Sequence, residues 1–335
     1  MRDRYGREID YLRISVTDKC NLRCRYCMPG DIESIPMGEI LSFEEIAYIA
    51  GRAAELGISR LRITGGEPLV RRDCCTLVKM LKNIPGIEQV TMTTNGVLLE
   101  KYIDELKNAG VDGINISIDT LDRERFRSVT GADRLPDVLR GLSAALGIGI
   151  KVRINAVSVD WDRYHKDMCA DPYEDAWSLI GLAMEKPVDV RFIEMMPIGY
   201  GRGFPAIPHD ILIPAIKKRF GDMIPEEGRR GNGPAKYYRI PGYKGSIGFI
   251  SAVHGKFCDS CNRIRLTSKG YLKSCLCYDT GVDLKDVIRS DMTDKEKKDA
   301  VMAGVEKAIL CKPAAHSFTK EENISEKHAM SAIGG

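Results

Sequence analysis

The chain has 335 residues, of which 44% are hydrophobic and 29% are charged, and its formal net charge is +3. This composition is that of a globular protein and excludes disorder and collagen, while so small a charge gives no support for nonspecific binding to nucleic acid. Because no apolar run is long enough to span a bilayer and the N-terminal stretch MRDRYGREID lacks the apolar centre of a secretory signal, we expect a cytoplasmic protein that uses neither membrane nor nucleic acid.

Short β-rich runs alternate with amphipathic helical stretches from about residue 10 to residue 196. Such alternation is typical of repeated βα units around a parallel sheet. Six successive units without an evident chain reversal predict a barrel or partial barrel, although a doubly wound open sheet fits the same alternation. The six predicted strands are Tyr11–Val16, Arg60–Thr64, Gln89–Thr93, Gly113–Ile118, Lys151–Val157 and Asp189–Met195.

Helix signals are clear at two places between these strands. One predicted helix begins with a capping box at Ser42 and ends at Gly57. Another runs from Leu98 to Gly110, a residue type that commonly ends helices. The stretch Asp160–Pro172 has no clear pattern, so we predict a long loop there.

The sequence changes character after Met196, where stretches rich in glycine and proline surround one predicted helix at His209–Phe220. We therefore expect a barrel domain of residues 1–196 and a C-terminal extension of residues 197–335. We expect each histidine of the chain to be structural or on the surface: His165, His209, His254, His316 and His328.

Three cysteines, Cys20, Cys24 and Cys27, follow the first predicted strand within one loop. The chain has eleven cysteines, and a reducing compartment argues against pairing them as disulfides. Structural zinc takes four ligands, and no histidine lies near this loop. Three thiolates instead suit a cubane iron–sulfur cluster whose fourth iron stays open to another ligand. A three-legged zinc site or a loop of free thiols is the alternative.

Glycine-rich or polar motifs follow the next three predicted strands. Gly65–Pro68 (GGEP) follows the second strand, residues 94–96 (TNG) the third, and Asp119 the fourth. Because the carboxyl ends of parallel strands lie at the same edge of a barrel, these motifs would line one mouth with the cysteine loop. Gly65 and Gly66 would allow their backbone groups to approach a ligand closely.

A second cysteine group has the spacing C-x2-C-x13-C and consists of Cys258, Cys261 and Cys275. Cys277 leaves the chemistry of this group open. If Cys277 is a ligand, the site is a closed zinc or cluster site; if it is not, a second cluster keeps an open iron for a substrate.

Arg263 and Arg265 lie between these cysteines and alternate as on a strand, so their side chains would point the same way. Paired guanidinium groups match a phosphate chain. We therefore expect a strongly anionic small substrate such as a nucleotide triphosphate. Its phosphates would be held by side chains, because the sequence has no Walker-type loop.

The first cysteine group resembles the signature of the radical S-adenosylmethionine superfamily, with an aromatic residue, Tyr26, before the last cysteine. Gly65–Pro68 is similar to the motif by which that superfamily binds the amino group of its cofactor. This resemblance implies that S-adenosylmethionine chelates the open iron. An electron from the reduced cluster then breaks the sulfonium bond and yields a 5′-deoxyadenosyl radical.

The combined motifs resemble one family over nearly the whole chain, the GTP 3′,8-cyclases, also called molybdenum cofactor biosynthesis protein A. The matching segments are residues 12–20, 27–29, 61–69, 93–96, 116–122, 191–196, 233–235, 257–267 and 334–335. The resemblance implies an α/β fold, an incomplete (βα)6 TIM-like barrel with a C-terminal extension that carries a second iron–sulfur cluster and closes the open side. It also implies a lyase that converts GTP to (8S)-3′,8-cyclo-7,8-dihydroguanosine 5′-triphosphate, the first step of molybdenum cofactor biosynthesis.

The resemblance assigns cofactors, partners and residues. Two 4Fe–4S clusters would be held by Cys20, Cys24 and Cys27 and by Cys258, Cys261 and Cys275. Contacts to S-adenosylmethionine are implied for Tyr26, Gly66, Ser117 and Met196. Contacts to GTP are implied for Arg13, Arg62, Thr93, Arg153, Arg191, Arg263, Ile264 and Arg265, with Arg153 in the place of a usual lysine. Roles in catalysis are implied for Arg263, Arg265, Arg13, Gly334 and Gly335.

Further expected partners are a reducing electron donor and the downstream cyclic pyranopterin monophosphate synthase, and the protein would be a monomer or a homodimer. Two other functions stay open. A radical enzyme that modifies peptides would cleave S-adenosylmethionine without turning over GTP. An iron–sulfur electron carrier without enzymatic activity would bind no S-adenosylmethionine, although the GGEP motif argues against that alternative.

Overall fold

The computed structural model describes residues 1–30, 35–165, 171–228 and 230–334. Gly335, the side chain of His165 and residues 166–170 of the predicted loop lie outside this described part. The first part of that stretch is not a loop, because Trp161–His165 form helix α6. Asp160 caps its first turn by accepting a hydrogen bond from Arg163 N–H at 2.8 Å.

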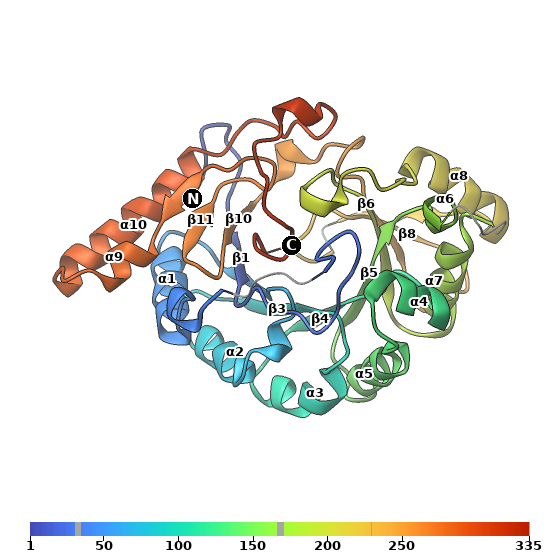
Figure 1. The fold of residues 1–335 in the computed structure, drawn as a ribbon, viewed down its shortest axis with the longest axis horizontal. Coiled ribbons are helices and arrows are strands. Elements are labelled where there is room, and N and C mark those ends of the chain that lie inside the picture. Colours follow the sequence, from blue (N-terminus) through green and yellow to red (C-terminus); the bar gives the residue numbers. More distant parts are fainter. Residues whose placement is uncertain (31–34, 166–170, 229, 335) are drawn as a thin grey trace.

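The six predicted strands form the centre of one sheet and run parallel in chain order, from β1 to β6. A doubly wound sheet reverses its strand order at a switch point, so this uninterrupted order excludes that alternative and confirms the partial barrel. Figure 1 shows the sheet curving into a ring. The strands are β1 Tyr11–Ser15, β2 Arg60–Thr64, β3 Gln89–Thr94, β4 Gly113–Ser117, β5 Val152–Ser158 and β6 Asp189–Glu194.

Strands from the C-terminal part of the chain extend the sheet at both edges. β9 (Ile247–Ile250) lies parallel to β6, and β10 (Arg263–Leu266) lies parallel to β1. Antiparallel strands follow outside them, so the sheet ends at β12 on one side and at β7 on the other. These are β7 Ile224–Pro225, β8 Lys236–Arg239, β11 Tyr271–Lys273 and β12 Gly281–Asp283. The residues after 196 therefore complete the part of the barrel wall that the first six strands leave open.

Helices surround the ring (Figure 1), because a crossover between parallel strands returns along the outside of the sheet. The predicted capping box of α1 is confirmed: Glu45 N–H donates to Ser42 Oγ at 3.1 Å, and Ser42 N–H donates to Glu45 Oε2 at 2.7 Å. In the described part, no helix has the length and apolarity that crossing a membrane requires. The longer helices are α1 Phe43–Glu55, α2 Cys74–Lys82, α3 Leu99–Asn108, α4 Arg123–Thr130, α5 Leu135–Gly147, α7 Glu174–Glu185 and α8 His209–Phe220.

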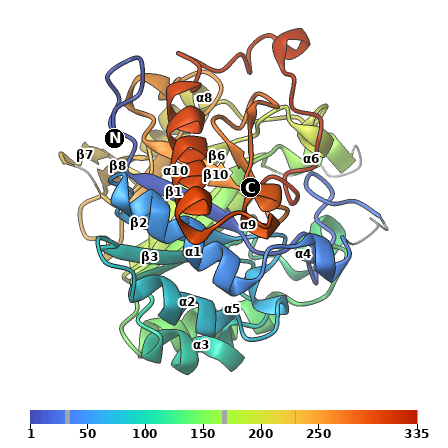
Figure 2. The same ribbon diagram turned by 90° about the vertical axis from the view of Figure 1, so that its left-hand side faces the viewer.

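Helices α9 (Lys285–Arg289) and α10 (Asp294–Leu310) correct the expectation of a single helix after residue 196. A signal for α10 is present in the sequence, since Thr293 and Glu296 form a capping box at its start. Figure 2 shows α10 lying along the outside of the ring next to α1. Its buried residue Val305 joins the main hydrophobic core, so the C-terminal part shares one core with the barrel.

The inner face of the sheet is polar because residues alternate along each strand. Leu12 and Ile14 of β1 are fully buried in the core between sheet and helices, whereas Arg13 between them faces the inside of the ring. Arg265 of β10, Arg13 of β1 and Arg62 of β2 are direct neighbours in register. Three arginines thus form a row across adjacent strands, which we call the arginine row.

Candidate active site

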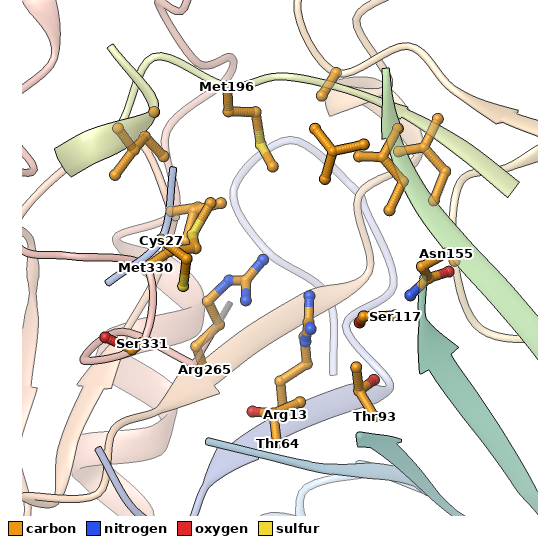
Figure 3. A pocket seen from close by; sticks show the side chains of 18 of the residues that line it. Arg13, Cys27, Thr64, Thr93, Ser117, Asn155, Met196, Arg265, Met330 and Ser331 are labelled. Atoms are coloured by element: carbon orange, nitrogen blue, oxygen red, sulfur yellow. The ribbon is translucent and has the colours of Figure 1, made fainter. Parts of the chain in front are cut away.

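A cavity of about 320 Å³ lies inside the ring at the carboxyl ends of the parallel strands. The six cysteines of the two predicted groups line it, together with the glycine pair of the GGEP motif and the end of β3. Figure 3 shows Arg13 and Arg265 projecting side by side into this space, with Cys27 on one side and Asn155 on the other. Motifs that lie far apart in the sequence therefore share one chamber.

The loop that carries the first three cysteines is fixed by backbone hydrogen bonds. Arg23 N–H donates to the carbonyl of Thr130 at 2.7 Å, and Cys27 N–H donates to the carbonyl of Cys24 at 2.9 Å. Burial raises the pKa of the Cys24 thiol, and the neighbouring Cys27 raises it further. These thiols are therefore neutral on their own, and a metal centre that binds them displaces their protons.

The glycine pair after β2 also packs against the cysteine loop, in addition to the access for a ligand that the sequence predicts. A Cβ atom on Gly66 would lie 2.5 Å from the carbonyl oxygens of both Asp18 and Lys19. The next residue adds a hydrogen bond, from Glu67 N–H to the carbonyl of Lys19 at 2.8 Å. Only a residue without a side chain allows the two loops to meet this closely.

Glu67 connects the ends of β2 and β3 beneath the cysteine loop. Its fully buried carboxylate accepts hydrogen bonds from Thr94 Oγ1 at 2.8 Å and from Asn95 N–H at 2.6 Å. Asn95 Nδ2 in turn donates to Cys20 Sγ at 3.7 Å. Burial raises the pKa of Glu67 to about 7. The GGEP motif thereby holds the first cysteine in place.

We expect the substitution Gly66→Ala to destabilise the protein by about 1–3 kcal/mol, because the new methyl group overlaps two backbone carbonyls. It should also displace the cysteine loop and lower the iron bound there. Urea unfolding of the metal-free protein and iron analysis after reconstitution measure the two effects. Gly51→Ala is the control, since Gly51 lies within α1 with open space at its Cβ position and should gain about 0.5–1 kcal/mol. A free energy of unfolding for Gly66→Ala equal to that of the parent contradicts this account.

The residues expected to contact S-adenosylmethionine all line the cavity: Tyr26, Gly66, Ser117 and Met196. Tyr26 is fixed at both ends of its side chain. Its hydroxyl donates to Asp119 Oδ2 at 2.6 Å, and its ring lies 6.2 Å from that of Trp161. Asp119 is held in turn by Val157 N–H at 2.8 Å, and burial raises the pKa of Asp119 to about 6. The wall beside the first cysteine loop is therefore rigid.

Five buried or half-buried arginines line the cavity: Arg13, Arg62, Arg191, Arg263 and Arg265. Burial, and after it the charge of a neighbouring arginine, lowers the pKa of both Arg13 and Arg265. Within the described chain, Nε and Nη2 of Arg263 and Oγ1 of Thr93 are buried without a hydrogen-bond partner. A polyanionic ligand would both neutralise this charge and satisfy these atoms.

Two expected contacts to GTP do not line this cavity. Arg153 is buried with its Nε 3.5 Å from Asp189 Oδ2, so it forms an ion pair at the start of its strand. Ile264 is fully buried in the core, as a residue between two inward-facing arginines must be.

Cys277 differs from the three cysteines of the second group. It is fully buried and lies outside the cavity lining, and its Sγ accepts a hydrogen bond from Ser317 N–H at 3.4 Å. Cys261, by contrast, faces positive charge: burial opposes ionisation, but the charges of Lys312 and Arg263 lower the pKa of Cys261 to about 7. The geometry therefore favours a second site with three thiolates.

The spacing of the cysteines suits iron–sulfur clusters better than zinc. A zinc ion with Zn–S distances of about 2.3 Å draws its thiolates to within about 4 Å of one another. Among the described residues, only Asp279, Glu326 and His328 form a group of three with donor atoms within 4.8 Å, so neither cysteine group is that compact. That acidic group already has a positive partner in place of a metal ion. Lys273 Nζ lies 3.2 Å from Asp279 and is also paired with Glu326.

The C-terminal segment enters the ring and ends near its centre in Figure 1. Arg265 Nη1 donates a hydrogen bond to the carbonyl of Gly334 at 2.7 Å. Gly334 has a φ of +73°, and a Cβ atom on it would lie 3.3 Å from the Cβ of Ser15. Ile333 before it is buried. The structure thus brings Gly334 to the arginine row, while Gly335 lies outside the described residues.

Other residues of the cavity wall had no sequence signal or a weak one. His316 lines the cavity, and its backbone N–H donates to Cys258 Sγ at 3.3 Å, a position that the sequence did not indicate. Lys312 also lines it, following the helix α10 that was not expected. Asn155 in the middle of β5 accepts a hydrogen bond from Arg191 Nη2 at 2.5 Å. The only sequence signal for Asn155 was its inward-facing position on a predicted strand.

Comparison with known proteins gives two family matches along the chain. The radical SAM superfamily matches residues 14–160, and the family Molybdenum Cofactor Synthesis C matches residues 188–318. The GTP 3′,8-cyclase of Clostridium perfringens strain 13 is 43% identical over 336 aligned residues, covering 100% of both chains. That of Alkaliphilus oremlandii is 41% identical over 337 aligned residues, again covering 100% of both.

The fold is also similar to that of solved structures. SuiB of Streptococcus suis bound to S-adenosylmethionine aligns with a TM-score of 0.63 at 15% identity, covering 97% of this chain and 78% of that one. SuiB bound to its precursor peptide SuiA aligns with a TM-score of 0.61 at 15% identity, covering 97% and 76%. At this identity the likeness shows a common fold.

Proposed function

Since the chain belongs to the GTP 3′,8-cyclase family of radical S-adenosylmethionine enzymes, we propose that it binds GTP in the cavity between its two cysteine groups. The enzyme uses S-adenosylmethionine and 4Fe–4S clusters, and its product would be (8S)-3′,8-cyclo-7,8-dihydroguanosine 5′-triphosphate for molybdenum cofactor biosynthesis. The observation that carries this proposal is the arginine row, which lies inside one chamber with both cysteine groups.

The residues of the chain fit the implied groups. We assign Cys20, Cys24 and Cys27 to the first cluster and Cys258, Cys261 and Cys275 to the second, because all six thiols face the cavity. When bound, the first cluster and S-adenosylmethionine supply the 5′-deoxyadenosyl radical that removes a hydrogen atom from the ribose.

The arginines would bind the triphosphate and so fix the ribose at the first cysteine loop. The unpartnered Nε and Nη2 of Arg263 are suited to a phosphate oxygen, and the guanidinium groups of Arg13 and Arg265 extend the same positive surface. Tyr26 and Asp119 would hold the cofactor side rigid. Positioning of this kind supplies up to about 7–11 kcal/mol of a barrier.

One assay separates this function from the two alternatives. The protein is reconstituted without oxygen and given reductant, S-adenosylmethionine and GTP, and the products are identified by mass spectrometry. We expect both 5′-deoxyadenosine and an isomer of GTP. Deoxyadenosine without the isomer favours a peptide-modifying enzyme, whereas the absence of both favours an electron carrier.

We expect Arg263→Ala and Arg265→Ala each to weaken GTP binding by about 1.5–3 kcal/mol, roughly 10- to 150-fold in Kd, because a desolvated charge-assisted hydrogen bond is lost. Binding of S-adenosylmethionine should change little. Isothermal titration calorimetry measures both affinities. Arg72→Ala serves as the control, since the Arg72 side chain is 95% exposed. Equal GTP affinity in the Arg263 variant and the parent overturns the triphosphate assignment.

Several partners follow from the proposed function. The clusters require a reducing electron donor, and the product would pass to cyclic pyranopterin monophosphate synthase. A reducing compartment such as the cytoplasm suits thiols that hold iron. We further propose that residues 1–196 supply the radical chemistry and residues 197–335 the second cluster, in a monomer or a homodimer.

A further inference from the structure

Lys312 is a buried lysine at the second cysteine group whose three donors are all engaged. Its side chain is almost enclosed, with the residue 4% exposed. Nζ donates hydrogen bonds to the carbonyls of Arg263 at 2.8 Å and Ser274 at 2.9 Å, and to Cys261 Sγ at 3.6 Å. An ammonium group has three N–H donors, so these contacts use its full capacity.

The positive charge of Lys312 has no carboxylate partner among the described residues. Lys273, which precedes Ser274 and is 1% exposed, provides the contrast, because it is paired with both Asp279 and Glu326. Arg7, another cation near this site, is paired with Asp3 at 2.6 Å. A buried charge without a counter-ion is costly, so an anion is expected beside Lys312. The group in contact that can carry negative charge is the sulfur of Cys261.

The same ammonium group joins two segments that build the site, residues 261–263 and Ser274. Cys261 is the second cysteine of the group, Ser274 directly precedes the third, and Arg263 begins strand β10. Arg263 also carries the unpartnered Nε and Nη2 in the cavity. One side chain thus links the positions of two cysteines to the backbone of an arginine that faces the substrate space.

We propose that Lys312 is a positioning residue whose charge neutralises the second iron–sulfur cluster and raises its reduction potential. This inference rests on the proposed ligand set of the second cluster. Removal of a buried positive charge disfavours the reduced cluster, which carries one more negative charge than the oxidised one. A merely structural lysine would leave the potential unchanged.

The test uses the full-length protein with Cys20, Cys24 and Cys27 replaced by alanine, so that only the second site binds a cluster. Redox titration followed by electron paramagnetic resonance then measures its midpoint potential. In Lys312→Met we expect at least a tenfold shift toward the oxidised cluster at a fixed ambient potential, equal to 59 mV for one electron. Lys312→Gln keeps a hydrogen-bond donor and loses the charge, so it should shift by a similar factor. Lys307→Met, at an exposed position of α10, should match the parent.

An unchanged midpoint potential in Lys312→Gln overturns the charge role. This conclusion holds even if Lys312→Met binds no second cluster. Both variants could instead lose the iron of this site while their unfolding temperatures equal that of the parent. In that case the cluster needs the charge of Lys312 in order to bind, which supports the counter-ion role. The titration contains neither S-adenosylmethionine nor GTP. Failure of the parent protein, with all its cysteines, to cyclise GTP overturns the proposed function, and a shift in this titration then leaves the present inference standing.

Discussion

Alanine at Cys20, Cys24 or Cys27 should abolish cleavage of S-adenosylmethionine, reducing 5′-deoxyadenosine to the level of a control without protein. A cluster with one open iron needs three protein thiolates, and these three are the cysteines of the loop fixed between β1 and the GGEP motif. Backbone hydrogen bonds hold the loop, so its three thiols keep their positions.

Cys277→Ala is the matched control for this prediction. The substitution is the same, but Cys277 is buried outside the cavity, so iron content, deoxyadenosine and cyclised GTP should all persist. Deoxyadenosine formed by any of the three loop variants contradicts the assignment of the first cluster. Loss of iron in Cys277→Ala shows instead that the second cluster has a fourth thiolate ligand.

Deletion of Gly334 and Gly335 should lower the ratio of cyclised GTP to 5′-deoxyadenosine by about 10- to 100-fold while both clusters remain. Gly334 gives its carbonyl to Arg265 and lies against Ser15 and Thr64, so its loss frees a guanidinium group of the arginine row. Displacement by about 1 Å at such a position can cost 100-fold in rate. Cleavage of the cofactor depends on the other side of the cavity and should continue uncoupled.

The ratio is measured by mass spectrometry of both products in the same reaction. Gly149→Ala is a suitable control, since Gly149 also has a positive φ but has open space at its Cβ position and lies outside the cavity lining. An unchanged ratio in the truncated protein would mean that the tail has no part in positioning GTP. The role of Gly335 rests on the family resemblance alone, because it lies outside the described residues.

Much of the barrel could be predicted from the sequence because each βα unit is local. The strands were expected to within a residue at each end, and Ser42 marked the start of α1. The family resemblance implied that the C-terminal extension closes the open side, but the strand pairing that does so could not be predicted, because β9 and β10 pair with strands that are distant in the sequence. Their short apolar runs carry no mark of the partner that each will choose.

The features of the site also fall into those that local sequence patterns predict and those that depend on packing between distant segments. Cysteine spacing and the alternation of Arg263 and Arg265 are local patterns, and they identified groups that the cavity brings together. The buried position of Arg153 and the contacts of Lys312 depend on packing between segments, for which sequence spacing gives no measure. The chemical type of each group could therefore be predicted from local sequence patterns, whereas the partners of the charged groups could be identified only from the three-dimensional structure.

The placement of β10 beside β1 has a consequence for the order in which this protein matures. The arginine row joins Arg265, near the end of the chain, to Arg13, near its start, with Arg62 on the next strand. During synthesis the first six strands can collapse on the ribosome, but the arginine row exists only after β10 (Arg263–Leu266) has emerged and docked beside β1. Contacts between such distant segments form slowly. A nascent chain that has not yet docked β10 therefore lacks one of the three guanidinium groups of the arginine row.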